Sequence, residues 1–333
     1  MNIEYTGTKK RIIAVVGVPR SGTSAITKGL DAMGIDIGKN LNSPPDIGNE
    51  KGFFEDADIN SLNYGLLKML TGKPDNAILI DLKNIPEQVI TIFKSAAKNI
   101  LKERLCNTDI FGFKDPFIAK LLPIWMEIFN ELQLNVSFVV VCRNPKSSAL
   151  SMVKRGNMDI IIAYYIWLSG MVSVFDCILN PMLSSDAVFV DYDDMLENPE
   201  EQLLKIASRL KLKIDHENNP AFKEYINDFL TNSMRHAAFT IEDLKIDVNI
   251  PPKVTEFYIL LRKLCSEALY ITDSNVIREF TKIKIWLKEL SSTIFFMQAS
   301  YDTLLAMNEV LIEKENKIAE LSRTIDVFSQ KQK

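Results

Sequence analysis

The residues from Gly17 to Ser24, GVPRSGTS, carry the chain's clearest set of groups for binding an anion. A β-branched apolar run precedes them and an amphipathic segment follows, so we predict a loop between a strand and a helix. Amide N–H groups converge at the start of such a helix, and the helix dipole adds partial positive charge there. Hydroxyl groups and a two-pronged guanidinium add further donors. We therefore predict that a phosphate-like group is held by Arg20, Ser21, Gly22, Thr23 and Ser24.

The spacing of Gly17 and Gly22 is that of a nucleotide-binding phosphate loop, but Thr23 stands where that loop has lysine. The positive charge has moved to Arg20, inside the loop. Such a loop can hold a phosphate, yet it is poorly equipped to neutralise a β,γ-phosphate bridge together with magnesium. A phosphate–sulfate anhydride carries less charge and needs no metal, so no metal site is expected. The alternative is a strand-to-helix turn rich in small residues, with Arg20 on the surface.

A second anion site is predicted from Arg143 and Ser151 in the segment FVVVCRNPKSSALS. Arg143 follows the strongest buried-strand pattern in the chain, and Pro145 favours a helix that starts directly afterwards. Ser151 then lies two turns into that helix, so both side chains can reach one phosphate. The alternative is an arginine paired with a surface carboxylate and a helix serine without a role.

Lys114 and Glu55 are candidates for groups that act in a reaction. Lys114 ends a predicted strand and is a second cation for the anion; its alternative is a solvated lysine paired with Asp115. Glu55 follows two phenylalanines, and aromatic neighbours could raise its pKa into the range of a general base. Its alternative is a residue in a first helical turn, favoured by the dipole. Weaker candidates for the base are Asp56, Asp58 and His236, and the remaining histidine, His216, lies in a polar surface loop.

Apolar runs that predict strands alternate with amphipathic segments that predict helices. The strands are expected at 11–18, 109–113, 135–142 and 186–191, and the helices at 23–34, 56–71, 86–105, 117–133, 158–180 and 199–211. This alternation predicts an α/β layered fold with a central parallel sheet. Ligands bind at the carboxyl ends of the strands in such sheets, and the loop at Gly17 lies at the end of the first strand.

The loop PRSGTS and the pair Arg143–Ser151 resemble the two anion sites of the PAPS-dependent sulfotransferase superfamily, which has bacterial, carbohydrate and tyrosyl-protein branches. PAPS is 3′-phosphoadenosine-5′-phosphosulfate. In that family the loop holds the 5′-phosphosulfate, and an arginine with a serine eight residues later holds the 3′-phosphate. The resemblance covers roughly residues 11–240. It implies a P-loop NTPase-like three-layer fold and transfer of a sulfuryl group from PAPS to a hydroxyl, which leaves adenosine 3′,5′-bisphosphate (PAP).

Further segments support the resemblance. VDYDDMLENP is similar to a late strand and helix whose tyrosine contacts adenine in the small-molecule branch, which implies that role for Tyr192. NEKGFFEDADINSLN and FGFKDPF resemble stretches of bacterial sulfotransferases, although Phe117 replaces the usual arginine of the second. NSMRHAA, with Arg235 and His236, is similar to a later L-R-H element. By analogy with bacterial relatives, the acceptor hydroxyl is expected on a saccharide or a glycolipid.

Sulfuryl transfer resembles phosphoryl transfer, in which negative charge builds on the leaving phosphate and the protein positions both partners. We therefore expect Arg20 and Lys114 to stabilise that charge and Glu55 to take the proton of the acceptor. Two alternatives stay open. A nucleotide-dependent P-loop kinase is disfavoured by Thr23 in place of lysine, and a non-catalytic PAP-binding scaffold would assemble through the C-terminal tail.

That tail carries a seven-residue apolar repeat. The first seam is formed by Val276, Ile283, Leu290, Met297, Leu304, Leu311, Ile318 and Ile325. The second seam is imperfect, because the polar residues Glu279, Thr293, Ser300 and Lys314 interrupt its apolar positions. We predict a coiled coil over 276–333 that pairs with another copy of the chain or with a partner protein. The alternative is a long helix packed on its own domain. The chain would then comprise a sulfotransferase domain at 1–240, a helical connector at 241–275 and this tail.

The composition narrows the class of partner. A formal net charge of −4 and a pI of about 5.5 give no basic field, so nucleic acid is not expected as a partner. The four cysteines are widely separated and form no CxxC pair, which disfavours a zinc site and suits a reducing compartment. The first residues lack the apolar core of a signal peptide, and no uncharged apolar run reaches the length of a membrane span. We expect a cytoplasmic protein.

Overall fold

The computed structural model describes residues 9–42, 52–156, 158–180, 186–230 and 239–331 of the chain. Within these residues, β1 (Arg11–Val16), β2 (Ile110–Lys114), β3 (Asn135–Cys142) and β4 (Asp186–Asp191) form one sheet in the order β2-β1-β3-β4. Each neighbouring pair of strands is parallel. The predicted strands and the parallel sheet are confirmed, and β1 lies at the centre with its carboxyl end beside those of β2 and β3.

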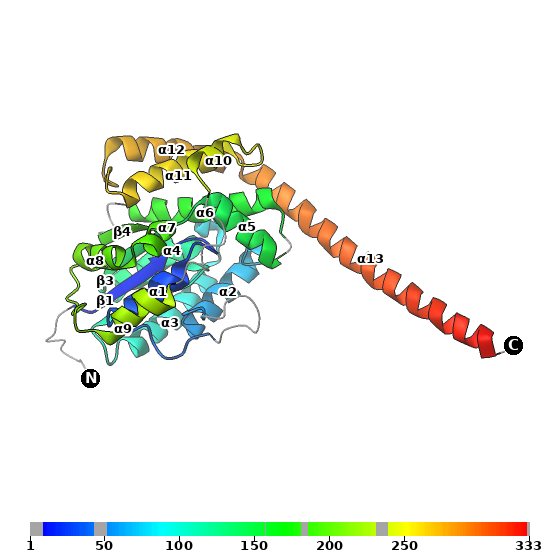
Figure 1. The fold of residues 1–333 in the computed structure, drawn as a ribbon, viewed down its shortest axis with the longest axis horizontal. Helices are drawn as coiled ribbons and strands as arrows, with labels where there is room; N and C mark the ends of the chain where they lie inside the picture. Colours follow the sequence, from blue (N-terminus) through cyan, green and yellow to red (C-terminus); the bar gives the residue numbers. More distant parts are fainter. Residues whose placement is uncertain (1–8, 43–51, 157, 181–185, 231–238, 332–333) are drawn as a thin grey trace.

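Helices connect and cover the strands (Figure 1). Those that precede β4 are α1 (Thr23–Ala32), α2 (Ala57–Thr71), α3 (Glu87–Arg104), α4 (Ile118–Glu131), α5 (Pro145–Gly156) and α6 (Ile160–Ile178). Those that follow it are α7 (Tyr192–Glu197), α8 (Pro199–Arg209), α9 (Pro220–Glu224), α10 (Ile241–Ile246), α11 (Pro252–Cys265), α12 (Ser274–Glu289) and α13 (Ser291–Lys331). Two short turns, Leu82–Asn84 and Tyr225–Phe229, complete the described elements.

The alternation of side chains along the strands divides the core into two layers. Ile12, Ala14 and Val16 of β1 join a large cluster that contains side chains of α2–α6, α11 and α12. Ile13 and Val15 join a smaller cluster with side chains of α1 and α8. All five residues are fully buried, as expected for a parallel sheet covered on both faces. The predicted three-layer α/β fold is therefore confirmed.

Helix α6 is long and apolar enough to cross a membrane, by length and composition, but 72% of its most apolar stretch is buried inside the protein. Asp159 caps its start by accepting hydrogen bonds from the amides of Ile161 and Ile162 at 2.8 and 3.3 Å. Gly170 allows the helix to approach the loop after β1, because a Cβ atom there would lie 2.7 Å from Val18 Cγ1. Helix α6 is thus a core helix that backs this loop.

The coiled coil predicted over 276–333 is wrong in its first half. Val276 and Ile283 belong to α12, have exposed fractions of 0% and 2%, and pack into the same core as α6 and α11. In that core Phe280 contacts Phe175 of α6, with ring centroids 4.7 Å apart. Helix α12 ends at Glu289, and α13 starts at Ser291. A seven-residue apolar repeat looks the same in a sequence whether it packs on its own domain or on a partner. Here the first part of the repeat, in α12, packs on the domain.

The first turns of α13, which include the buried residues Ile294 and Gln298, pack on the domain. Beyond them, α13 projects from the body of the protein as one long helix (Figure 1). The seam residues Leu304, Leu311 and Ile318 have exposed fractions of 64%, 57% and 63%. In the described part of the tail, this outer section is where the seam is open to a partner. The division of the chain at residues 240 and 275 stays a prediction, although α11 and α12 share the core of the sheet.

Candidate functional site

The loop after β1 leads directly into α1, as the sequence predicts. Gly22 is the N-cap of α1 with φ 92°, and Arg20 also adopts a left-handed conformation with φ 66°. That conformation is uncommon for a residue with a side chain and is found where the surrounding structure imposes it. Ser21 is fully buried, and its Oγ atom has no hydrogen-bond partner in the described part of the chain. A buried hydroxyl in this state at a helix N-terminus suits a bound anion.

Tyr192 starts α7, directly after β4, and packs against this loop. Its exposed fraction is 4%, and the guanidinium of Arg143 stacks on its ring with Cζ 4.7 Å from the centroid. The ring also fills the space beside Gly22, where a Cβ atom would lie 2.0 Å from Tyr192 Cδ2. The predicted contact of Tyr192 with adenine stays a prediction. Its observed contacts support the loop and orient Arg143.

Replacing Gly22 with alanine should destabilise the fold strongly, because it adds a clash with Tyr192 to the backbone strain. Gly34→Ala is a matched control: Gly34 has φ 89°, but nothing lies within 4 Å of its Cβ position. The control should cost about 1 kcal/mol for backbone strain alone. Gly22→Ala should cost about 2 kcal/mol more, since overpacking adds to that strain. Urea unfolding measures both; equal losses would show that Tyr192 does not pack on the loop.

Arg143 lies at the end of β3, and its guanidinium joins the two predicted anion sites. Its Nη1 atom donates a hydrogen bond to the backbone oxygen of Arg20 at 2.8 Å. The residue has an exposed fraction of 6%, and its buried Nε atom has no hydrogen-bond partner among the described residues. A donor left over at this depth points to a ligand that accepts from it. The alternative of an arginine paired with a surface carboxylate is wrong.

Ser151, on α5, accepts a hydrogen bond from Arg20 Nε at 2.9 Å. The prediction that Ser151 faces the second anion site together with Arg143 therefore needs a correction: in this structure its hydroxyl is engaged by the loop arginine. One helical turn after Ser151 stands Arg155, whose guanidinium lies over the Phe53 ring at 5.3 Å. The sequence reasoning missed Arg155, although a basic residue four positions after Ser151 was a usable signal.

Arg143 and Arg155 both act on Arg20 as like charges. Desolvation lowers the pKa of Arg20, and the nearby charges of Arg155 and Arg143 lower it further. Desolvation likewise lowers the pKa of Arg143. Within the described ranges, none of the three forms an ion pair with a carboxylate. Like charges held close together without a counterion destabilise a site, and a bound anion removes that cost.

Lys114 ends β2 and lies on the other side of the N-terminus of α1. It is buried, with an exposed fraction of 4%, and its Nζ donates to Glu55 Oε1 at 2.5 Å. It also donates to Ser24 Oγ and to the backbone oxygen of Phe53, each at 3.3 Å. The alternative of a solvated lysine paired with Asp115 is wrong. The structure places Lys114 against the phosphate loop through Ser24.

The environment predicted for Glu55 is wrong in two respects. Its carboxylate is paired with Lys114 and accepts a hydrogen bond from Asn42 Nδ2 at 3.1 Å, so a cation rather than aromatic rings dominates its surroundings. It also precedes α2 and is not in its first turn, because Asp56 is the N-cap of that helix. Its role as general base stays a prediction.

The weaker candidates for the base have other partners or lie elsewhere. Asp56 and Asp58 both form ion pairs with Arg104 of α3, which ties the start of α2 to α3. His216 packs against Phe222, with ring centroids 6.1 Å apart. Arg235 and His236, which suggested the L-R-H element, lie outside the described residues.

Asp115 follows Lys114 and is fixed by three donors. It accepts hydrogen bonds from Asn60 Nδ2 at 2.8 Å, Asn63 Nδ2 at 2.9 Å and the Phe117 amide at 2.9 Å. Burial raises the pKa of Asp115 to about 6, against the effect of the two asparagine donors. These contacts set the turn after β2, so that Pro116 and Phe117 face a pocket beside the loop.

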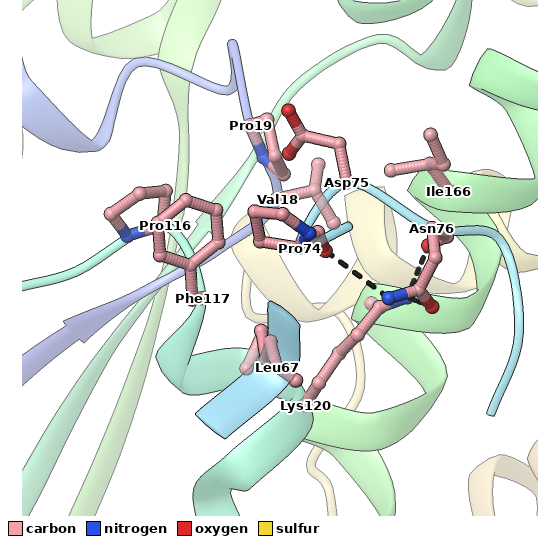
Figure 2. Close-up of a pocket in the computed structure, with 12 residues that line it drawn as sticks. Val18, Pro19, Leu67, Pro74, Asp75, Asn76, Pro116, Phe117, Lys120 and Ile166 are labelled. Atoms are coloured by element: carbon pink, nitrogen blue, oxygen red, sulfur yellow. Dashed lines mark hydrogen bonds between the residues drawn. The ribbon is translucent and has the colours of Figure 1, made fainter. Parts of the chain in front are cut away.

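This pocket is small, with a volume of about 20 Å³, and shares the residues Val18 and Pro19 with the phosphate loop (Figure 2). Its apolar walls include Leu67, Pro116, Phe117 and Ile166, and its polar lining is Asp75, Asn76 and Lys120. Phe117 therefore contributes an apolar wall where the resembling stretch has arginine. The sequence reasoning missed the polar lining, because these residues come from a loop and a helix without a recognisable motif.

Lys120 crosses the pocket toward Asn76 (Figure 2). Burial lowers its pKa to about 7. Its Nζ donates to the side-chain oxygen of Asn76 at 2.6 Å, to the backbone oxygen of Asn76, and to that of Ile78 at 3.1 Å. Three acceptors around one amine match the three hydrogens of an ammonium group. Lys120 thus fastens the loop that follows α2 to α4.

No family model matches the chain, and no curated protein sequence matches it. Among solved structures, the sulfotransferase domain of the Synechococcus olefin synthase is similar over 85% of this chain and 98% of its own, with a TM-score of 0.40 and 16% identity. The mouse sulfotransferase SULT7A1, solved with PAP, covers 83% of this chain and 90% of its own, with a TM-score of 0.38 and 16% identity. The Mycobacterium tuberculosis sulfotransferase STF1 covers 75% and 77%, with a TM-score of 0.38 and 14% identity. Over most of its length, this chain has structural matches to sulfotransferase domains at low sequence identity.

Proposed function

We propose that this protein is a PAPS-dependent sulfotransferase that transfers a sulfuryl group to a hydroxyl. The observation that carries the proposal is the position of Arg20 and Arg143 beside the N-terminus of α1, joined by a hydrogen bond and with no carboxylate partner in the described ranges. The Oγ atom of Ser21 and the Nε atom of Arg143 are buried there and have no hydrogen-bond partner among the residues that the structure describes. A ligand with two separate anionic groups would satisfy both, and PAPS is such a ligand.

The residues around the loop divide between the two anionic ends. Ser21, Gly22, Thr23 and Ser24 would hold the 5′-phosphosulfate through the first turn of α1, with Arg20 and Lys114 as cations on either side. Arg143 and Ser151 would hold the 3′-phosphate. The hydroxyl of Ser151 would donate to that phosphate, and Arg20 would give up its present hydrogen bond to Ser151. When bound, PAPS supplies an activated sulfuryl group. The protein's contribution is then to orient the acceptor and to stabilise the charge that develops on the leaving phosphate.

The lining beside the loop favours an acceptor whose hydroxyl is carried by an apolar group, and such an acceptor would have to widen the small pocket there. Its walls are mostly aliphatic, aromatic and proline side chains, and two of its three polar side chains are bonded to each other. A bare saccharide needs many hydrogen-bond partners, so a glycolipid or a small phenol suits this lining better. A cytoplasmic location stays a prediction.

Titration with PAP in a calorimeter tests the proposal, and turnover of labelled PAPS in EDTA separates it from the alternatives. We expect PAP to bind and sulfuryl transfer to proceed without magnesium. A chain that binds PAP but transfers no label to any hydroxyl in a panel of phenols, lipids and saccharides would be the non-catalytic scaffold. Magnesium-dependent hydrolysis of ATP without PAP binding would favour the kinase.

We further propose that the exposed part of α13 pairs in parallel with a second copy of the chain. In a parallel coiled coil the two copies of Lys314 face each other at the d position, and each lies next to Glu315 at the e position of the other helix, so the like charges of this layer are compensated. Leu304, Leu311 and Ile318 would then cover one another rather than stay exposed.

Replacing Leu311 with glutamate in the full chain should convert a dimer to a monomer in sedimentation velocity experiments, because two charges would face each other in the seam. Asn316→Glu is the matched control. It adds the same charge to the same helix at an exposed position off the seam and should leave the dimer intact. If the unaltered chain sediments as a monomer, pairing with a second copy is wrong and a different partner protein has to be sought.

A further inference from the structure

The turn after β2 contains a buried network of polar side chains around Asp115. Asn63 is fully buried, and its Oδ1 atom accepts a hydrogen bond from Trp125 Nε1 at 2.9 Å. An indole N–H can only donate, so the Nδ2 atom of Asn63 is left to face Asp115, to which it donates at 2.9 Å. Asn60 Nδ2 and the Phe117 amide also donate to Asp115. The carboxylate therefore serves as the common acceptor of three donors.

This network joins three elements of the fold at one residue. Asp115 directly follows β2, Asn60 and Asn63 belong to α2, and Phe117 is the N-cap of α4. Asp115 has an exposed fraction of 2%, so water cannot replace a hydrogen bond that is lost there. A buried donor without an acceptor is costly, which favours a single arrangement of the three elements. Asp115 thus ties the end of β2 to α2 and to the start of α4.

The same junction fixes the surroundings of Lys114 from two sides. Lys114 is the last residue of β2 and the neighbour of Asp115, and Glu55 stands just before α2. The Nζ atom of Lys114 lies 2.5 Å from Glu55 Oε1 and 3.3 Å from Ser24 Oγ in the first turn of α1. A lysine side chain has many conformers, and holding it in one costs entropy. Because Asp115 ties β2 to α2, it keeps the backbone of Lys114 and the start of α2 at a fixed separation.

We propose that Asp115 is a positioning residue that holds Lys114 beside the phosphate loop, where Lys114 binds the 5′-phosphate group of PAPS. This inference rests on the proposed function. Asp115 itself is buried and engaged by three donors, so it acts through Lys114 and not on the ligand. A cation that is already in place when the ligand arrives loses little entropy on binding, which is the benefit of this junction.

Two nucleotides separate the positioning of Lys114 from general damage to the fold. Adenosine 3′-phosphate lacks the 5′-phosphate of PAP, so its affinity does not depend on Lys114. Asp115→Ala should raise the Kd for PAP about tenfold and that for adenosine 3′-phosphate less than about twofold in calorimetric titrations. Asp115→Asn should keep the Kd for PAP within about threefold of the unaltered chain, because Asn60 can turn its amide to accept from the new one.

A double-variant cycle tests whether Asp115 acts through Lys114. Lys114→Met should show the same loss confined to PAP, and Asp115→Ala combined with Lys114→Met should bind PAP no more weakly than Lys114→Met alone. Asn60→Ala removes one of the three hydrogen bonds to Asp115 and should raise the Kd for PAP about threefold. This milder variant takes the place of Asp115→Ala in the cycle if the latter does not fold.

Trp125→Phe is the matched control for lost stability. It removes the donor to Asn63 but leaves all three hydrogen bonds to Asp115, so it should lower the midpoint of urea unfolding and change the Kd for PAP less than about twofold. Unchanged PAP affinity in Asp115→Ala, equal losses for both nucleotides, additive losses in the cycle, or an equal loss in Trp125→Phe would overturn the inference. An unaltered chain that binds neither nucleotide would instead remove the proposed function.

Discussion

Replacing Arg143 with alanine should raise the Kd for PAP at least about a hundredfold, which corresponds to about 2.7 kcal/mol. The guanidinium is buried, has an unpartnered Nε atom, and is held by the Arg20 carbonyl at 2.8 Å and by the Tyr192 ring. It is therefore set in place before a ligand arrives, and little ordering entropy is lost when two parallel hydrogen bonds to a phosphate form. Isothermal titration with PAP measures the effect.

Two variants make this result specific to the site. Arg143→Lys keeps the charge but loses the planar fork and the stacking on Tyr192, so we expect an intermediate loss of about tenfold. Arg209→Ala removes an exposed arginine that pairs with Glu267 far from the loop, and it should change the Kd by less than about twofold. PAP binding to Arg143→Ala within about threefold of the unaltered chain would contradict the assignment of the second anion site.

Replacing Lys114 with methionine should lower kcat by two to three orders of magnitude, the usual effect of losing one preorganised group that stabilises charge in the transition state. The same change leaves Glu55 as a buried carboxylate without its cation. The exposed fractions of the two side chains are 5% and 10%, so the unpaired charge should cost about 3 kcal/mol of unfolding free energy. Steady-state kinetics and urea unfolding measure the two effects separately.

The double variant Lys114→Met with Glu55→Gln separates catalysis from stability. It removes both charges, so the unfolding free energy should recover most of the loss while kcat stays low. Recovery of kcat together with stability would show that Lys114 only supports the fold. An unchanged kcat in Lys114→Met itself would remove this residue from the reaction altogether.

The sequence predicted the sheet and the phosphate loop well, because both depend on local patterns. Fully buried strands such as β3 require continuous apolar runs, and the turn from β1 into α1 requires a glycine with φ 92° at position 22. Arg143 could be predicted for the same reason: it stands between a strand and a helix, and the carboxyl ends of neighbouring parallel strands meet at one edge.

Pairings between distant segments could not be predicted. Glu55 and Lys114 are 59 residues apart, and nothing in either segment shows that this lysine is the partner of the Glu55 carboxylate. Asp75 and Gln298 are further apart still in the sequence. They meet because the first turns of α13 pack against the loop that follows α2. The tail shows the same limit, because Val276 and Leu311 occupy equivalent positions in the repeat but only the first is buried by the domain.

Gln298 stands on the same helix as the exposed apolar residues of the tail, only six positions before Leu304. One end of α13 is therefore packed against the domain, and the other end projects from it (Figure 1). A partner that bound the projecting end and bent or twisted the helix would strain the hydrogen bonds that Gln298 forms with Asp75 and Ala77. The projecting part of α13 and the loop at Asp75 are thus connected through one continuous helix.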